Sequence, residues 1–133
     1  MSQRPRTPVL LRASALAAVL FGAATIISGA RMLFGSDAVQ QAAGNVVPWV
    51  LWFNTVAGLA YIAAGVGLCL RHAWAVRLSA ALAAASVLVF AALGVHIALG
   101  GAYQARTLAA MALRCTFWIG LAWFAARTNR AAR

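Results

Sequence analysis

The chain contains almost no acidic side chains. Its 133 residues include one, Asp37, against eleven arginines and no lysine, and charged residues make up 9% of the sequence. Soluble globular domains carry about 25% charged residues, so this composition excludes an ordinary soluble domain. Because 65% of the residues are hydrophobic, we predict an integral membrane protein of the all-α class. The arginines flank apolar runs rather than lining a folded polar face, which argues against nucleic-acid binding.

The scarcity of titratable groups also excludes several membrane activities. A proton-coupled antiporter uses an intramembrane carboxylate, and the apolar segments contain none. Cys69 and Cys115 fall at different predicted depths, too far apart for disulfide exchange. His72 and His96 fall at opposite ends of one predicted span, which excludes a bis-histidine haem. We therefore predict no enzyme activity and no cofactor, although single-histidine haem ligation, or a quinone beside His96 and Tyr103, stays open.

Four apolar stretches are long enough to cross a hydrocarbon layer of about 30 Å as helices that rise about 1.5 Å per residue. We place them at residues 13–34, 47–70, 78–99 and 106–126. Eight of the eleven arginines precede the first stretch, join the second to the third, or follow the fourth. Arginine-rich loops face the cytoplasm. The sequence thus predicts one domain over residues 1–133, a four-helix transmembrane bundle with both termini cytoplasmic.

Two short signals support this arrangement. Residues 37–43, after Ser36 and before Gly44, predict a short surface helix that ends at the glycine. Pro48 falls at the first turn of the second span, where the missing N–H costs nothing. Both features place the segment between the first two spans outside the bilayer.

Arg114 lies inside the fourth apolar stretch. A guanidinium stays charged at ordinary pH, so at that depth it needs a partner, a water-filled cavity or an anionic ligand. Helical spacing puts Arg114 on one face with Met111 and Trp118, and puts Asn54 and Tyr61 on one face of the second span. We expect these faces to meet, so that Asn54 and Tyr61 accept from Arg114. The plain alternative is that Arg114 only ties helices together.

The remaining polar groups of the spans lie in their outer halves. Arg31, His96 and Arg106 fall near outer ends, and Asp37 and Tyr103 in the outer loops can close over them. One carboxylate cannot neutralise three arginines, so a positive field remains. We predict a cationic pocket that binds, and in one version of this hypothesis transports, a small anionic or polar ligand. Its candidate binding residues are Arg114, Arg106, Arg31, Asn54, His96, Tyr103, Asp37 and Tyr61.

Two other functions stay open. His96, Met111 and Cys115 offer imidazole, thioether and thiolate, the ligand set that suits Cu(I). Arg114 beside them would repel a cation, so we predict no metal and keep these three residues as weak candidates. The second alternative is a non-catalytic accessory subunit, whose arginines and aromatic residues pack against a larger membrane complex, a second copy of the chain or lipid headgroups.

The sequence PWVLWFN at residues 48–54, His96 and the run GGAYQART at residues 100–107 are the most distinctive segments. They make Val47–Trp118 similar to a family of small four-helix bacterial inner-membrane proteins, most of which are called uncharacterised. The resemblance implies a multi-pass protein of the bacterial inner membrane and implies no activity. An acidic residue is expected in this family where the chain has Gln104, and its absence removes a natural salt-bridge partner of Arg106.

Overall fold

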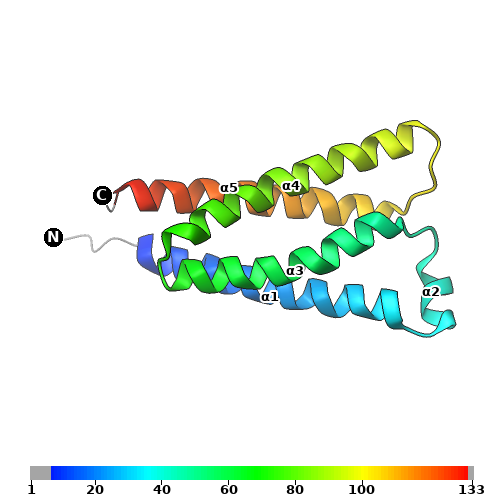
Figure 1. Ribbon diagram of the computed structural model, residues 1–133, viewed down its shortest axis with the longest axis horizontal. Helices are drawn as coiled ribbons and strands as arrows, with labels where there is room; N and C mark the ends of the chain where they lie inside the picture. The colour runs from blue at the N-terminus through cyan, green and yellow to red at the C-terminus, as the bar shows by residue number, and fades with distance from the viewer. Residues whose placement is uncertain (1–6, 132–133) are drawn as a thin grey trace.

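The computed structural model describes residues 7–131 of the chain, and in this range it is helical with no strand. Four long helices are apolar enough to cross a membrane, which confirms the predicted all-α transmembrane bundle. The start of α1 and the end of α5 lie at one end of the bundle, and the short helix lies at the other (Figure 1). The helices are α1 (Thr7–Phe34), α2 (Asp37–Ala43), α3 (Pro48–Cys69), α4 (Ala73–Ala98) and α5 (Ala105–Ala131).

The long helices extend beyond the predicted spans at the end where the termini lie. α1 begins at Thr7, α4 begins at Ala73 and α5 continues to Ala131. Hydropathy detects only the part of a helix that lies in hydrocarbon, whereas a helix can continue through the headgroup layer when its arginines reach water. Arg12 and Arg127, both exposed, lie in such extensions. Three arginines on which the predicted orientation also depends, Arg4, Arg6 and Arg133, lie outside the described residues.

Glycines bring α1 and α3 into backbone contact, and no other pair of helices packs as extensively. A Cβ atom added at Gly22 would lie 2.7 Å from the backbone oxygen of Gly58, and one added at Gly65 would lie 2.7 Å from that of Ala15. Between lipid-surrounded helices, close packing of small residues takes the place of a hydrophobic driving force. The α1–α3 pair is therefore the rigid side of the bundle.

The four long helices form a ring that is loosely packed at one place. α5 packs on α4, and α4 packs on α3, but α5 makes few contacts with α1. Tight turns connect neighbouring helices: Arg71 has a φ of 58° after α3, and Gly100 has a φ of 84° after α4. The chain therefore leaves one loosely packed seam, between α1 and α5.

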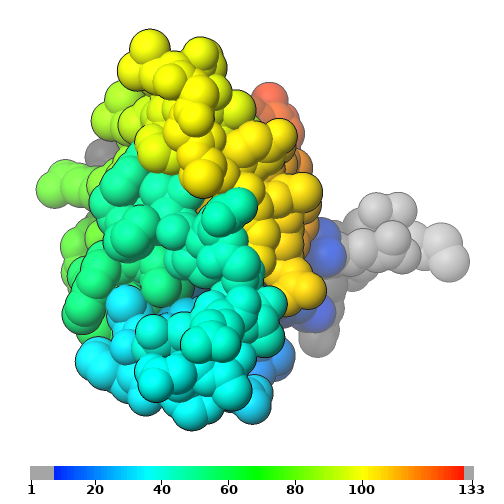
Figure 2. Space-filling view, turned by 90° about the vertical axis from the view of Figure 1, so that its right-hand side faces the viewer, coloured from blue at the N-terminus to red at the C-terminus, as the bar shows by residue number. Residues whose placement is uncertain are grey.

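The end of the bundle opposite the termini, called the outer end below after the predicted orientation, carries the short helix and the turn before α5. Figure 2 looks onto this end, where α2 (cyan) lies at the lower edge, the turn before α5 (yellow) lies at the upper edge, and the segment that follows α2 (teal) lies between them. α2 spans the predicted residues, and Gly44 ends it with a φ of 74°. The side-chain amide of Gln104 donates to the backbone oxygen of Ala43. This bond ties the end of α2 to the start of α5.

Side chains that face away from the bundle suit a bilayer. Leucines such as Leu16, Leu59 and Leu88 are exposed along α1, α3 and α4. Exposed tryptophans lie toward the helix ends, Trp52 near the outer end and Trp123 near the other. An apolar band with aromatic residues at its edges is the surface expected of a membrane-spanning protein.

Candidate binding site

Arg114 lies half-buried in α5, nine residues after Ala105 and about 13 Å below the outer end of the helix. Its Nη2 donates to the Thr25 hydroxyl of α1 over 3.4 Å, and its Cζ lies 5.6 Å from the centre of the Phe21 ring. Its Nε is buried without a hydrogen-bond partner in the described structure. The only acidic side chain of the sequence, Asp37, is exposed on α2. The structure thus gives the guanidinium one long neutral hydrogen bond.

The outer half of the seam contains a cavity of about 140 Å³ next to Arg114. Its walls come from the outer parts of α1, α3 and α5 and from the loop before α3. The apolar part of the lining includes Val47 and Val50 at the start of α3. Polar side chains from all three helices reach the cavity: Thr25, Ser28, Asn54, Arg106, Thr107 and Arg114.

Asn54 gives this cavity an unused acceptor. Its side chain is 9% exposed, and its Oδ1 has no hydrogen-bond partner among the described residues. A buried amide oxygen without a partner costs about 1–3 kcal/mol. Arg114 lines the same cavity, and its Nε is also buried without a partner. Arg114 needs an acceptor and Asn54 Oδ1 needs a donor, so an oxyanion in the cavity would satisfy Arg114, whereas a water molecule or a protonated ligand would satisfy Asn54.

A second group of unpartnered polar atoms lies in the bundle interior next to Arg114. The Tyr61 hydroxyl, near Ser86, Trp118 and Arg114, has no hydrogen-bond partner in this structure, and neither do Ser86 Oγ and Trp118 Nε1. The Tyr61 and Trp118 rings are 4.7 Å apart, between centres. Trp118 and Arg114 can only donate, whereas the two hydroxyls can also accept. This interior cluster supplies alternative partners for the guanidinium within reach of small side-chain movements.

The structure brings some predicted site residues together and separates others. Arg106, Arg114 and Asn54 line one cavity, and Tyr61 lies beside it. The predicted inward faces of α3 and α5 are confirmed, because Asn54, Tyr61, Met111 and Trp118 are buried. Arg114, however, donates to Thr25 rather than to Asn54 or Tyr61.

The other candidates lie around the outer end. Arg31 is exposed near the end of α1, and Tyr103 is exposed in the turn before α5. His96 Nε2 lies 3.1 Å from the backbone oxygen of Ala102, and its ring meets Trp49 edge-on at 6.2 Å. None of these three, nor Asp37, lines the cavity. His96 thus holds the turn at residues 99–104.

Thr25 is the site residue that the sequence analysis missed. It is 4% exposed and faces the bundle on the same side of α1 as Ala18 and Gly22. These residues are separated by four and three positions, the same spacing that identified the inward faces of α3 and α5. The spacing of small residues on α1 was therefore the available signal.

Met111 and Cys115, two of the three weak metal candidates, are both buried on α5. Met111 is fully buried in an apolar cluster with Val50 and Leu93. Cys115 is also buried, one turn further along α5. No group of three or more histidine, cysteine or acidic side chains that could hold a metal ion occurs in the part of the chain that the structure describes.

Comparisons with protein-family models, with curated proteins and with solved structures found no match to this chain. The fold and the chemistry of the cavity are therefore the basis for a functional proposal.

Proposed function

We propose that this multi-pass membrane protein binds a small anionic molecule in the outer cavity and transports it. The observation that carries the proposal is the Arg114 guanidinium, which has no acidic partner among the described residues, a long hydrogen bond to Thr25 and a buried Nε without a partner. Placing an arginine near the middle of a membrane helix costs about 2.5–3.5 kcal/mol even on permissive scales. A single hydrogen bond to a neutral group contributes about 0.5–1.5 kcal/mol. The bond to Thr25, 3.4 Å long, thus leaves a deficit that an anion would remove.

The size of the cavity limits the ligand. About 140 Å³ is well below the roughly 300–1,000 Å³ of sites that take drug-sized molecules. At about 30 Å³ per water molecule, the cavity has room for four or five waters or an anion of a few heavy atoms. Planar oxyanions suit Arg114 best, because a guanidinium can donate two parallel hydrogen bonds to them.

The charge around the cavity favours anions over cations. Arg106 lines the cavity from the start of α5, and Arg31 is exposed at the outer end of α1. With Asp37 as the sole acidic side chain of the sequence, positive potential dominates the outer end. Such a potential raises the local concentration of anions and their rate of entry.

Anion-dependent stability tests this proposal. The purified protein is heated in chloride buffer with added nitrate, acetate or inorganic phosphate, and the midpoint of unfolding is followed. A ligand that binds only the folded state raises the midpoint. We expect at least one oxyanion to do so in the parent, less strongly in Arg114→Lys and not at all in Arg114→Leu. Uptake of the same anion into proteoliposomes, lost in Arg114→Leu, tests transport.

The matched control is Arg77→Leu, which removes one exposed arginine from the other end of the bundle. It should leave both anion stabilisation and uptake unchanged. Equal stabilisation of the parent and of Arg114→Leu would contradict binding at this cavity. Binding without uptake would contradict transport and favour a sensing or accessory role.

A further inference from the structure

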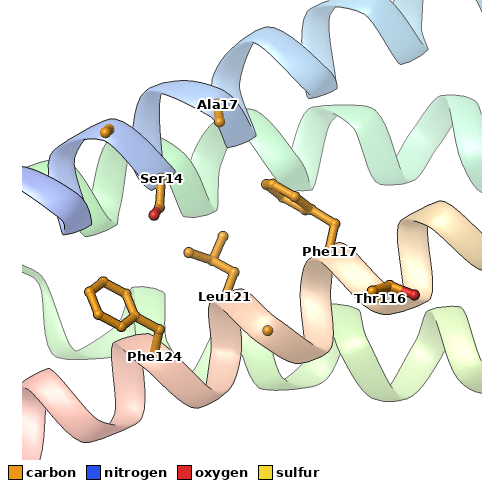
Figure 3. Close-up of a pocket in the computed structure, with 8 residues that line it drawn as sticks. Ser14, Ala17, Thr116, Phe117, Leu121 and Phe124 are labelled. Carbon is orange, nitrogen blue, oxygen red and sulfur yellow. The ribbon is translucent and has the colours of Figure 1, made fainter.

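The half of the α1–α5 seam that lies nearest the termini contains a second hollow, separate from the outer cavity. Its volume is about 470 Å³. Figure 3 shows that Ser14 of α1 and Phe117 and Leu121 of α5 point into the space between the two helices. This groove, called the α1–α5 groove below, is lined chiefly by Ala13, Ser14, Ala17, Phe117, Gly120 and Phe124.

The side chains that line the α1–α5 groove offer no free hydrogen-bond donor to an occupant. The Ser14 hydroxyl donates to the Leu10 carbonyl over 2.8 Å, and the Thr116 hydroxyl donates to the Ala112 carbonyl over 2.9 Å. A Cβ atom added at Gly120 would meet nothing within 4 Å, so the protein itself leaves this space unfilled. The occupant is therefore apolar where it touches the groove.

The groove is too narrow to enclose another helix. On α5 it runs from Thr116 to Phe124, about 12 Å along the helix axis. Spread over that length, 470 Å³ corresponds to a mean cross-section of about 40 Å², half the roughly 80 Å² of a helix 10 Å wide. A flexible hydrocarbon chain can lie inside a groove of this width, whereas a helix of a second copy could insert only side chains.

A cation marks the end of the groove nearest the terminus of α5. At about 100° per residue, Arg127 projects about 50° from the mean direction of the α5 groove residues. Its guanidinium lies over the ring of exposed Trp123, 3.9 Å from the ring centre. An arginine beside an aromatic ring at the membrane interface can bind a negatively charged headgroup. Arg127 does not line the groove, but it follows the groove residue Phe124 by three positions on α5 and so places a positive charge just beyond the end of the groove.

We propose that the α1–α5 groove holds an acyl chain of an anionic phospholipid whose phosphate binds Arg127. The lipid comes from the leaflet next to the chain termini, because the groove and Arg127 both lie in that half of the bundle. Its chain fills the space over Gly120 between the two helices. This lipid site is independent of the outer cavity and of its ligand.

Native mass spectrometry of the detergent-purified protein tests the site. The protein is incubated with equal amounts of phosphatidylglycerol and phosphatidylcholine that carry the same acyl chains. We expect one phosphatidylglycerol to be retained in preference to phosphatidylcholine. Arg127→Ala should weaken this retention about fivefold, the effect of one basic residue near an anionic lipid surface. Gly120→Leu, which fills open space, should lower retention of phosphatidylglycerol to that of phosphatidylcholine.

Arg12→Ala is the matched control. Arg12 is exposed near the same end of the bundle, but it projects about 150° away from the α1 groove residues. Its loss should leave retention unchanged. Equal retention of the two lipids by the parent would overturn the proposal, and so would equal weakening by Arg12→Ala and Arg127→Ala. A dimer without lipid, dissociated by Gly120→Leu, would overturn it in favour of a second copy. Circular dichroism confirms that each variant is folded.

Discussion

Adding one methyl group at Gly22 tests whether backbone contact holds α1 against α3. The new Cβ would lie 2.7 Å from the Gly58 backbone oxygen, 0.7 Å short of the 3.4 Å at which ordinary contact begins. That oxygen belongs to a helix and cannot move alone. The added Cβ atom would also lie 3.0 Å from Tyr61 Cβ and 2.9 Å from Ile62 Cγ1 of α3. The two helices must therefore separate by several tenths of an ångström.

The cost of that separation follows from dispersion forces, which dominate helix packing in lipid. One buried leucine makes about 40 atom contacts, each worth about 0.15 kcal/mol of dispersion energy. An interface with the same number of contacts therefore contributes about 6 kcal/mol. A gap of 0.5–1 Å forfeits about a quarter to a half of this. We therefore expect Gly22→Ala to lower the free energy of unfolding by about 1.5–3 kcal/mol, in the range measured for overpacked cores.

The midpoint of unfolding in mild detergent titrated with dodecyl sulfate, followed by circular dichroism, measures this effect. Gly120→Ala is the matched control, because it also places alanine in a helix but meets nothing within 4 Å. It should be no less stable than the parent. Gly58→Ala should cost less when added to Gly22→Ala than alone, because the helices are already apart. Equal midpoints for Gly22→Ala and Gly120→Ala would refute backbone contact between α1 and α3.

Two further predictions concern the cavity and the orientation of the chain. Gln104→Glu adds a carboxylate near Arg106 at the cavity, so we expect the affinity for anions to fall about tenfold, measured as lost thermal stabilisation; unchanged affinity would mean that anions bind elsewhere. Cys69 is exposed at the end of α3 on the side of the termini, whereas Cys115 is buried. An impermeant maleimide should therefore label Cys69 only after the cell membrane is permeabilised, and should label Cys115 under neither condition. Labelling of Cys69 in intact cells would reverse the predicted orientation.

The spans were predictable because bilayer thickness sets the length of an apolar run. Pro48 and Gly44 were predictable as boundaries for local reasons, since proline fits the first turn of a helix and glycine accepts a φ of 74°. The helix ends nearest the termini were not predictable from hydropathy. Arg12 and Arg127 lie within helices that continue past the predicted apolar spans, and hydropathy does not distinguish such an extension from a loop.

For the candidate site, the sequence predicts which face of each helix points inward but not which helices meet. Periodicity identified the inward faces of α3 and α5, including Asn54, Tyr61 and Arg114, because a face depends on spacing within one helix. It could not identify which neighbour each face meets. The partner of Arg114 is Thr25 on α1, because the glycines draw α1 against α3 and leave α1 opposite α5. That arrangement depends on contacts between segments far apart in the sequence.

The order of contacts along the α1–α5 seam bears on how a ligand could move. Thr25 and Arg114 meet in the outer half, and the rings of Phe21 and Phe117 come next, 5.3 Å apart between centres. The apolar groove beside Ser14 follows. An anion that enters from the outer end therefore meets an aromatic contact directly below its binding site, and the groove beyond that contact is lined mainly by apolar side chains. Transport requires α5 to move relative to α1, and this is the pair of neighbouring helices with the fewest contacts to break. Restraining the seam with a cross-link should then abolish anion uptake while leaving anion binding intact.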